Sequence, residues 1–277
     1  VFIDATGDGD LAAWAGCSYE RGYNAEGKNQ LSSLCFTIGN VNMESYKSGP
    51  RLDTNPPHVS PLFDAVKSGK YPLIDAYANV VIVGPGLLQF NAGHIDVDTT
   101  DPGKVSDAMR LGRLKANAYL QALKDLCPKT FDNAVIVKTA SVLGIRDSRR
   151  ITGDYTLTGD DWRARRTFED EIGRNCYYID IHGSDKRPQR YKKGESHGIP
   201  YRCLTPKGIE NLLTAGRCIS ADREAYGSTR IMPCCLVTGE AAGMAATLAI
   251  RGAGDNVHNI DVKNLRQRLR QRGQYFL

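Results

Sequence analysis

The chain has 277 residues, 41% of them hydrophobic, which is enough to bury the core of one large domain or of two. Its 36 basic and 31 acidic residues give a formal net charge of +5. This small excess favours anionic ligands and excludes the strongly basic surface of a nucleic-acid groove. Because no apolar run approaches the roughly 20 residues of a membrane span, we expect a soluble globular chain with no membrane partner.

Neither a targeting signal nor a metal site is indicated. The chain starts without Met or a basic n-region, in what resembles the middle of a strand. We therefore expect a truncated chain with a cytoplasmic location; a longer precursor with an export signal is the alternative. The eight cysteines include no C-x-x-C and no zinc-ligand spacing, so we expect small buried apolar residues. A redox pair of the adjacent Cys234 and Cys235 is the alternative.

The chain opens with VFIDATGDGDLAAWAG, which predicts a strand, a glycine turn and an alanine-rich helix. Gly7, Gly9 and Ala12 fit the dinucleotide fingerprint G-x-G-x-x-G/A. However, Asp8 and Asp10 place carboxylates where a pyrophosphate would approach, and no strand ending in an acidic residue follows about 20 residues later. Ionised carboxylates only accept hydrogen bonds, so the turn is predicted to bind hydroxyl groups, such as those of a polyol or ribose.

The middle of the chain predicts a mixed sheet with helices. Prolines interrupt residues 23–79, for which no element is assigned. The elements expected next are strands at 80–84 and 87–97, a helix at 101–128 capped by Asp101, an antiparallel strand pair at 134–145 and 151–158, a short helix capped by Thr158, and a strand at 175–183.

The last third of the chain is rich in small residues. Residues 211–220 predict a strand that ends in a loop, and residues 232–252 predict a helix crowded with Gly and Ala. Small residues allow a sheet or a ligand to approach the helix backbone closely. The closing helix at 261–273 has Leu265 and Leu269 on one face and arginines around the rest.

Two distant segments carry a family resemblance. The opening VFIDATGDGDLAAWAG and the late LLTAGRCISADREAYGSTRIMPCCLVTGEAAGMAA resemble segments of FAD-dependent oxidoreductases with the glutathione-reductase type of flavin domain. Between them, FNAGHIDVDTTDP, LGIRDSRRITGDYTLTGDD and YYIDIHG look like the insert of that family. The resemblance implies that the phosphate-binding G-x-G-x-x-G lies on a strand far upstream, and that the DATGDGD turn lines the FAD site.

The resemblance also implies a set of cofactor-binding residues. The helix after Pro233 would direct its unpaired N–H groups and its positive dipole end at the pyrimidine edge of the flavin. The residues implied at FAD are Ala5, Thr6, Gly7, Asp8, Gly9, Asp10, Gly216, Arg217, Arg230, Gly239, Glu240, Ala241 and Ala242. The alternatives are a tight strand-to-helix turn capped by Asp and, for residues 239–246, plain packing of a helix on a sheet.

Catalysis is expected from the inserted segment. The catalytic residues implied are Arg146, Arg149, Arg150, His94, His182 and Asn91. The arginines would bind a substrate carboxylate or cover the flavin, and a salt-bridged turn with Asp147 is the alternative. Histidine titrates near neutrality, so the two histidines are the candidates for proton transfer, with Asn91 and Asp180 as orienting neighbours. A structural hydrogen bond is the alternative for each histidine.

We expect an α/β fold in which a partial FAD/NAD(P)-binding flavin domain, residues 1–22 and 201–277, is interrupted by a mixed-sheet α+β substrate domain, residues 23–200. The implied function is hydride transfer between FAD and a small organic substrate. Because the chain contains no other strand-flanked G-x-G-x-x-G/A, it is expected to bind FAD weakly or not at all, to be inactive by itself, and to allow a homo-oligomer through an open sheet edge. The alternative is a cofactor-free packing or partner-binding module. Some relatives carry a xanthan-lyase-like label, although no polysaccharide-lyase site is recognisable.

Overall fold

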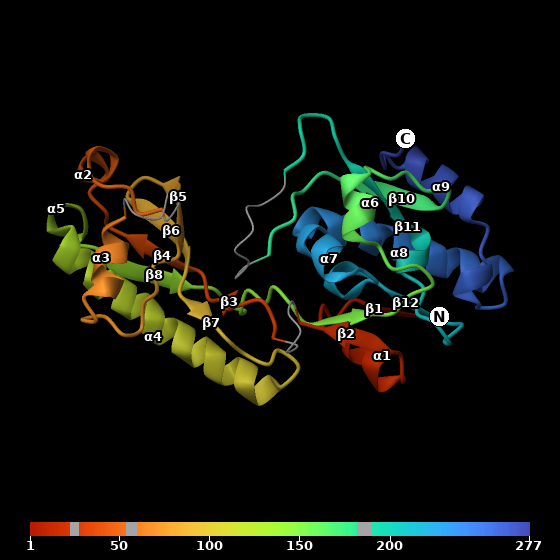
Figure 1. The fold of residues 1–277 in the computed structure, drawn as a ribbon, viewed down its shortest axis with the longest axis horizontal. Coiled ribbons are helices and arrows are strands. Elements are labelled where there is room, and N and C mark those ends of the chain that lie inside the picture. The colour runs from red at the N-terminus through yellow and green to blue at the C-terminus, as the bar shows by residue number, and fades with distance from the viewer. Residues whose placement is uncertain (23–27, 54–59, 182–189) are drawn as a thin grey trace. The chain divides into compact units, whose positions relative to one another are not determined.

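The computed structural model describes residues 1–22, 28–53, 60–181 and 190–277, which form two compact units (Figure 1). The first unit comprises residues 1–30 and 146–277, and the second comprises residues 31–145. Each unit is mixed α/β with small sheets. The predicted domain boundaries at 22/23 and 200/201 differ from these, because residues 146–200 belong to the same compact unit as both chain ends.

In the first unit, the described strands pair two by two. The pairs are β1 (Phe2–Asp4) parallel to β12 (Leu212–Thr214), β2 (Tyr19–Arg21) antiparallel to β9 (Arg149–Ile151), and β10 (Glu171–Asn175) antiparallel to β11 (His197–Pro200). In the first pair, Phe2 lies opposite Leu212 and Asp4 opposite Thr214. The predicted contact between the two distant segments is thereby confirmed.

The helices of the first unit are α1 (Asp10–Trp14), α6 (Gly159–Arg163), η2 (Tyr201–Cys203), η3 (Gly216–Cys218), α7 (Arg223–Thr229), α8 (Met232–Gly252), η4 (Val257–Asn259) and α9 (Val262–Gln271). The hydrophobic core of this unit is built around α8, whose alanines are fully buried. Leu265 and Leu269 of α9 complete this core, as the amphipathic pattern predicts.

The second unit contains a four-stranded antiparallel sheet and four helices among its described residues. The sheet order is β5 (Ala78–Gly84), β6 (Leu87–Ala92), β4 (Phe36–Gly39) and β8 (Val135–Thr139), and β3 (Ser32–Ser33) pairs with β7 (His94–Ile95). The helices are α2 (Met43–Ser48), α3 (Pro61–Lys67), α4 (Pro102–Leu126) and α5 (Pro128–Phe131). The core joins sheet and α4 through the rings of Phe36, Phe90 and Tyr119.

Two predicted elements of the second unit are present with adjusted ends. Helix α4 confirms the helix predicted at 101–128, and the Asp101 side chain caps it by accepting from the N–H of Gly103 at 2.9 Å. The strand predicted at 87–97 is divided into β6 and β7. Gly93 has a φ of 74° there, which interrupts the extended backbone.

Two predictions for the region 134–183 are wrong, one on the pairing of two strands and one on the position of a third strand. The segments 134–145 and 151–158 do not form a pair, because β8 pairs with β4 in the second unit and β9 pairs with β2 in the first. A strand was predicted at 175–183, but the observed strand β10 ends at Asn175, where the predicted strand begins. The side chain of Asn175 accepts a hydrogen bond from the N–H of Tyr177 at 3.1 Å, which turns the backbone out of β10.

Helix α8 contradicts the expectation that no segment is long and apolar enough for a membrane span. Among the described residues, it is the one helix that passes this test of length and composition, with a mean hydropathy of 1.4. In the 18-residue window of α8 that gives this value, 33% of the residues are buried. The buried side chains of α8 belong to the core of the first unit. A core helix of a soluble protein passes the same test, so this feature by itself assigns no membrane role.

Candidate functional site

A buried carboxylate organises the opening glycine turn. Asp4, at the end of β1, accepts hydrogen bonds from the Thr6 N–H (3.0 Å), the Thr6 hydroxyl (2.7 Å) and the Ala12 N–H (2.8 Å). Gly9 has a φ of 66°, and a Cβ at this position would lie 2.9 Å from the side chain of Ile151. The turn therefore requires glycine here, and Asp4 is the residue that satisfies its donors.

The other two carboxylates of the turn are paired with arginines from distant segments. Arg217 Nη1 donates to Asp8 Oδ1 at 2.8 Å, and Arg149 Nη1 donates to Asp10 Oδ1 at 2.6 Å. A Cβ on Gly7 would lie 2.8 Å from the Arg217 guanidinium, so this close approach also depends on glycine. The sequence predicts hydroxyl or backbone N–H donors for these carboxylates, and guanidinium groups take that place in the structure.

The adjacent arginines of β9 serve two different environments, because neighbouring strand residues point to opposite faces. Arg149 lies over the ring of Tyr19 at 5.3 Å and also donates to the carbonyl of Asp8. Arg150 is 2% exposed and lies over the ring of Tyr226 at 5.3 Å. Arg149 therefore holds the glycine turn, while Arg150 lies in the interior of the unit.

A buried polar cluster surrounds Tyr226, and we call it the Tyr226 cluster. Its members are Asp147, Arg150, Arg217, Tyr226 and Arg230. Asp147 is fully buried, lies 3.6 Å from Arg150 Nη1 and accepts from the N–H of Gln30 at 3.1 Å. Burial raises the pKa of both the Tyr226 phenol and the Asp147 carboxyl, because water no longer solvates the ionised forms. Arg146, another predicted site residue, directly precedes Asp147 in the sequence and is buried, with 8% of its surface exposed.

Helix α8 begins directly after the Tyr226 cluster. Arg230 Nη2 donates to the carboxylate of Asp180 at 2.9 Å, and α8 starts at Met232 without a side-chain cap. The N–H of Gly216 donates to the Thr238 hydroxyl at 2.9 Å, which holds the turn before Arg217 against the first turns of α8. The start of α8 therefore lies near the Gly216 turn, whereas the predicted orientation of its N–H groups toward a flavin stays a prediction.

The other residues predicted on α8 lie farther along the helix. Gly239, which the resemblance implies at FAD, follows Met232 by about two turns of the helix. Ala241 and Ala242 are fully buried in the core, and Glu240 is paired with Arg272 at 2.7 Å. These contacts are those of a packed helix, so a role of residues 239–242 in cofactor binding stays a prediction.

The predicted histidines are not gathered in the described part of this site. His94 and Asn91 lie in the second unit, where His94 stacks on Tyr77 at 4.3 Å and Asn91 accepts from the hydroxyl of Ser33. His182 lies outside the described residues. The assignment of a proton-transfer residue therefore stays a prediction.

A histidine that the sequence does not single out has a lowered pKa in the folded chain. His197 is fully buried, its Nδ1 lies 3.0 Å from the Tyr191 hydroxyl, and burial lowers its pKa to about 4. Since its pKa is lower in the folded than in the unfolded state, the stability it contributes is present above pH ~6.5 and is lost as the pH falls towards 4. The loss amounts to about 3 kcal/mol at most.

We expect this acid sensitivity to be visible in Trp fluorescence. Trp162 stacks on Tyr191 at 4.1 Å and reports on this region. Urea unfolding at pH 7 and pH 4.5 should give a larger loss of stability for the natural chain than for His197→Gln. Equal losses in both proteins would contradict the assignment of a neutral buried imidazole.

The described residues contain no cluster of His, Cys, Asp and Glu that could hold a metal ion. All eight cysteines are free thiols. Cys234 is buried in the core, and burial raises the pKa of both the Cys234 and the Cys235 thiol. Neither has the accessible thiolate character of a redox pair, so the alternative of small buried apolar residues is favoured.

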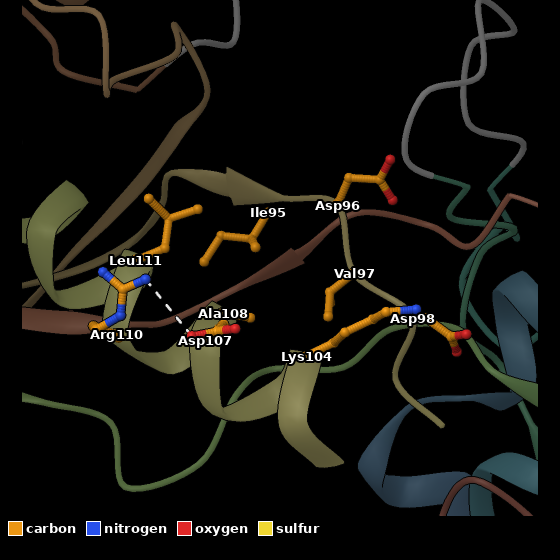
Figure 2. A pocket seen from close by; sticks show the side chains of 9 residues that line it. All are labelled: Ile95, Asp96, Val97, Asp98, Lys104, Asp107, Ala108, Arg110 and Leu111. Carbon is orange, nitrogen blue, oxygen red and sulfur yellow. Dashed lines mark ion pairs between the residues drawn. The ribbon is translucent and has the colours of Figure 1, made fainter. Parts of the chain in front are cut away.

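The second unit carries an open hollow of about 500 Å³ at the start of α4 (Figure 2). Asp96 and Asp98 lie on the loop after β7, and Lys104 and Arg110 project from the helix. Arg110 is paired with Asp107 at 3.6 Å. None of the predicted site residues that the structure describes lines this hollow.

Three residues of this site are not among the predicted site residues. Asp4 has a local signal, because an Asp two positions before a Thr is typical of an Asx turn. Asp147 is predicted only as the alternative partner of the arginines in a salt-bridged turn; it does pair with Arg150, and it is fully buried. Tyr226 had no signal in the sequence pattern, because its role depends on residues that are distant along the chain.

A comparison with known protein families gives one match over almost the whole chain. The family model described as FAD dependent oxidoreductase matches residues 1–269. No curated protein and no solved structure matches the chain. The match includes the glycine turn, the Tyr226 cluster and α8.

Proposed function

The chain belongs to the FAD dependent oxidoreductase family, and on that premise we propose that its first unit holds FAD and that the protein transfers hydride between FAD and a small organic substrate. The observation that carries the proposal is the convergence of three features in one unit. The glycine turn, the buried arginines and the uncapped start of α8 come from segments up to about 220 residues apart.

The residues of this unit fit the chemistry of the cofactor. Gly216 has a positive φ, and a Cβ there would meet only the Cys235 side chain, at 3.7 Å, so this backbone allows close approach by a ligand. Arg217 supplies a guanidinium that can meet a phosphate, and the first N–H groups of α8 suit an anionic group. We propose that FAD is held by this turn, by Arg217 and by the first turn of α8.

FAD supplies, when bound, the group that accepts or donates a hydride. The chain itself supplies orientation and a dry environment. Arg149 and Asp4 fix the glycine turn, and the Tyr226 cluster places buried cations beside it. Buried cations act strongly on a bound anion because little water screens them. We propose that they position the substrate, and that a histidine of the sequence prediction moves the proton.

A cofactor-free module is the second candidate, and one observation favours it. Arg217 and Arg149 are already paired with carboxylates of this chain, Asp8 and Asp10, and so do not need a ligand to neutralise their charge. Among the described strands, β1 pairs with β12 alone, so partner binding or a homo-oligomer through the open edge of β1 stays a prediction.

A titration with FAD separates the two candidates. We expect weak but saturable quenching of flavin fluorescence by the natural chain, because this chain has no second strand-flanked fingerprint, beyond the turn at Gly7 and Gly9, to add pyrophosphate donors. Arg217→Met should bind FAD about tenfold more weakly, since a charge-assisted hydrogen bond contributes about 1.5–3 kcal/mol. Arg202→Met, which removes an exposed arginine paired with Asp170, is the control and should bind as the natural chain does.

Two outcomes would contradict the proposal. The natural chain could remain folded by Trp fluorescence and show no saturable FAD binding, which would favour the cofactor-free module. Alternatively, Arg217→Met and Arg202→Met could bind FAD equally, which would remove Arg217 from the cofactor site.

A further inference from the structure

Besides the Tyr226 hydroxyl and Arg149 Nε, four buried polar atoms on the segments 148–150 and 229–230 have no hydrogen-bond partner among the described residues. They are Ser148 Oγ, Arg150 Nε, Thr229 Oγ1 and Arg230 Nε. Ser148, Arg150 and Thr229 are at most 2% exposed. A buried donor without a partner costs about 1–3 kcal/mol, and native proteins contain few of them. Their concentration on two short segments indicates a partner group that the chain itself does not supply.

The two segments belong to one site. Residues 148–150 lead into and form β9, and residues 229–230 end α7. The guanidinium of Arg150 lies over the ring of Tyr226 on α7. Asp147 is paired with Arg150 and also interacts electrostatically with Arg230. The two segments that carry the four atoms therefore meet at the Tyr226 cluster.

Both terminal nitrogens of Arg150 and one of Arg230 have partners. Arg150 Nη1 donates to the Gly22 carbonyl at 3.1 Å, and Arg150 Nη2 pairs with Glu20 at 3.3 Å. Arg230 Nη2 donates to Asp180 at 2.9 Å. These bonds fix the guanidinium planes and leave each Nε–H as an oriented donor.

The four atoms can all donate hydrogen bonds, and together they favour an anionic ligand. Two are cationic N–H groups and two are hydroxyls that can donate, so the set suits a group with several acceptor oxygens and a negative charge. A carboxylate has two oxygens with about four acceptor sites. We propose that Ser148, Arg150, Thr229 and Arg230 bind the carboxylate of a small anionic substrate. The identification as substrate rests on the proposed function, whereas the carboxylate site itself does not.

Malonate is a suitable probe, with malonamide as its neutral analogue. We expect malonate to bind the full chain saturably in isothermal titration calorimetry at constant ionic strength, and malonamide not to bind. Thr229→Val and Ser148→Ala each remove one hydroxyl with little change in volume, and each should weaken malonate binding at least about threefold. Without malonate both variants should be as stable as the natural chain or more stable, since an unpartnered buried hydroxyl is lost.

A matched control comes from the second unit. Ser32 is 1% exposed and its Oγ also has no partner among the described residues. Ser32→Ala should therefore leave the affinity for malonate unchanged. The proposal is overturned if malonate does not bind saturably, which is the result expected if ordered water completes the four donors. It is also overturned if Ser32→Ala weakens binding as much as Thr229→Val does.

FAD separates a substrate site from a cofactor site. For a substrate site we expect malonate to bind in the presence of saturating FAD, and exclusion of malonate by FAD would overturn the assignment to the substrate. Failure of the proposed function gives a different result. In that case FAD does not bind at all, while malonate still binds the natural chain and binds Thr229→Val more weakly.

Discussion

Asp4→Ala is expected to lower the free energy of unfolding of the first unit by about 4 kcal/mol. The Asp4 carboxylate is fully buried and accepts three hydrogen bonds from Thr6 and Ala12. Its removal leaves the buried Ala12 N–H without a partner, at about 1–3 kcal/mol, and breaks two charge-assisted hydrogen bonds from the exposed Thr6. Trp14 and Trp162 are the two tryptophans of the chain and both belong to the first unit. Urea unfolding followed by Trp fluorescence therefore measures this unit.

Two companion variants identify the cause of the loss. Asp4→Asn keeps one acceptor oxygen and should lose about half as much stability. Asp261→Ala removes an exposed carboxylate that caps α9 with a single bond to Asn264, and should cost about 1 kcal/mol. Equal losses for Asp4→Ala and Asp261→Ala would show that burial of the Asp4 carboxylate does not matter.

The same variant bears on the cofactor site. Asp4 holds the backbone between Thr6 and Ala12, and this segment includes Gly7 and Gly9. A relaxed turn no longer holds the backbone of Gly7 and Gly9 in one conformation, so Asp4→Ala should also weaken FAD binding in the fluorescence titration. Fold and proposed function depend here on one carboxylate.

The elements that were predictable from the sequence are those with strong local signals. Helix α4 has a capping Asp101 and a closing Pro128, and helix α9 has a simple amphipathic pattern. The contact of β1 with β12 followed from the family resemblance of the two segments. These signals lie within a few residues of each other or in motifs that have a fixed order.

The elements that were not predictable depend on partners that are distant along the chain. Nothing near residues 149–151 indicates that β9 pairs with β2 across about 130 residues. The same limit applies to the site. The arginines of GIRDSRR could be chosen as candidates by residue type, but their division between the glycine turn and the Tyr226 cluster depends on Asp10 and Tyr226.

Arg150→Met is expected to be the most destabilising change within the Tyr226 cluster, at about 3–5 kcal/mol. Asp147 is fully buried, and Arg150 is the cation nearest to it, at 3.6 Å. Removing one partner of a buried ion pair leaves the other charge without compensation. The double variant Arg150→Met/Asp147→Asn removes that charge as well, so it should regain at least half of the lost stability. Urea unfolding followed by Trp fluorescence measures both.

The pH dependence of Arg150→Met tests the same cause independently. Burial already raises the pKa of Asp147, and Arg150 is one of the groups that lower it. Without Arg150 the pKa of Asp147 in the folded state rises further above its unfolded value near 3.9. A group with a raised folded pKa contributes stability below the unfolded pKa and loses it as the pH rises through the folded pKa. The deficit of Arg150→Met relative to the natural chain should therefore shrink from pH 7 to pH 5, and Arg150→Met/Asp147→Asn should show no such recovery. A deficit that is independent of pH would mean that Arg150 stabilises the unit by packing over Tyr226, and the ionised Asp147 would then have to be compensated by other groups.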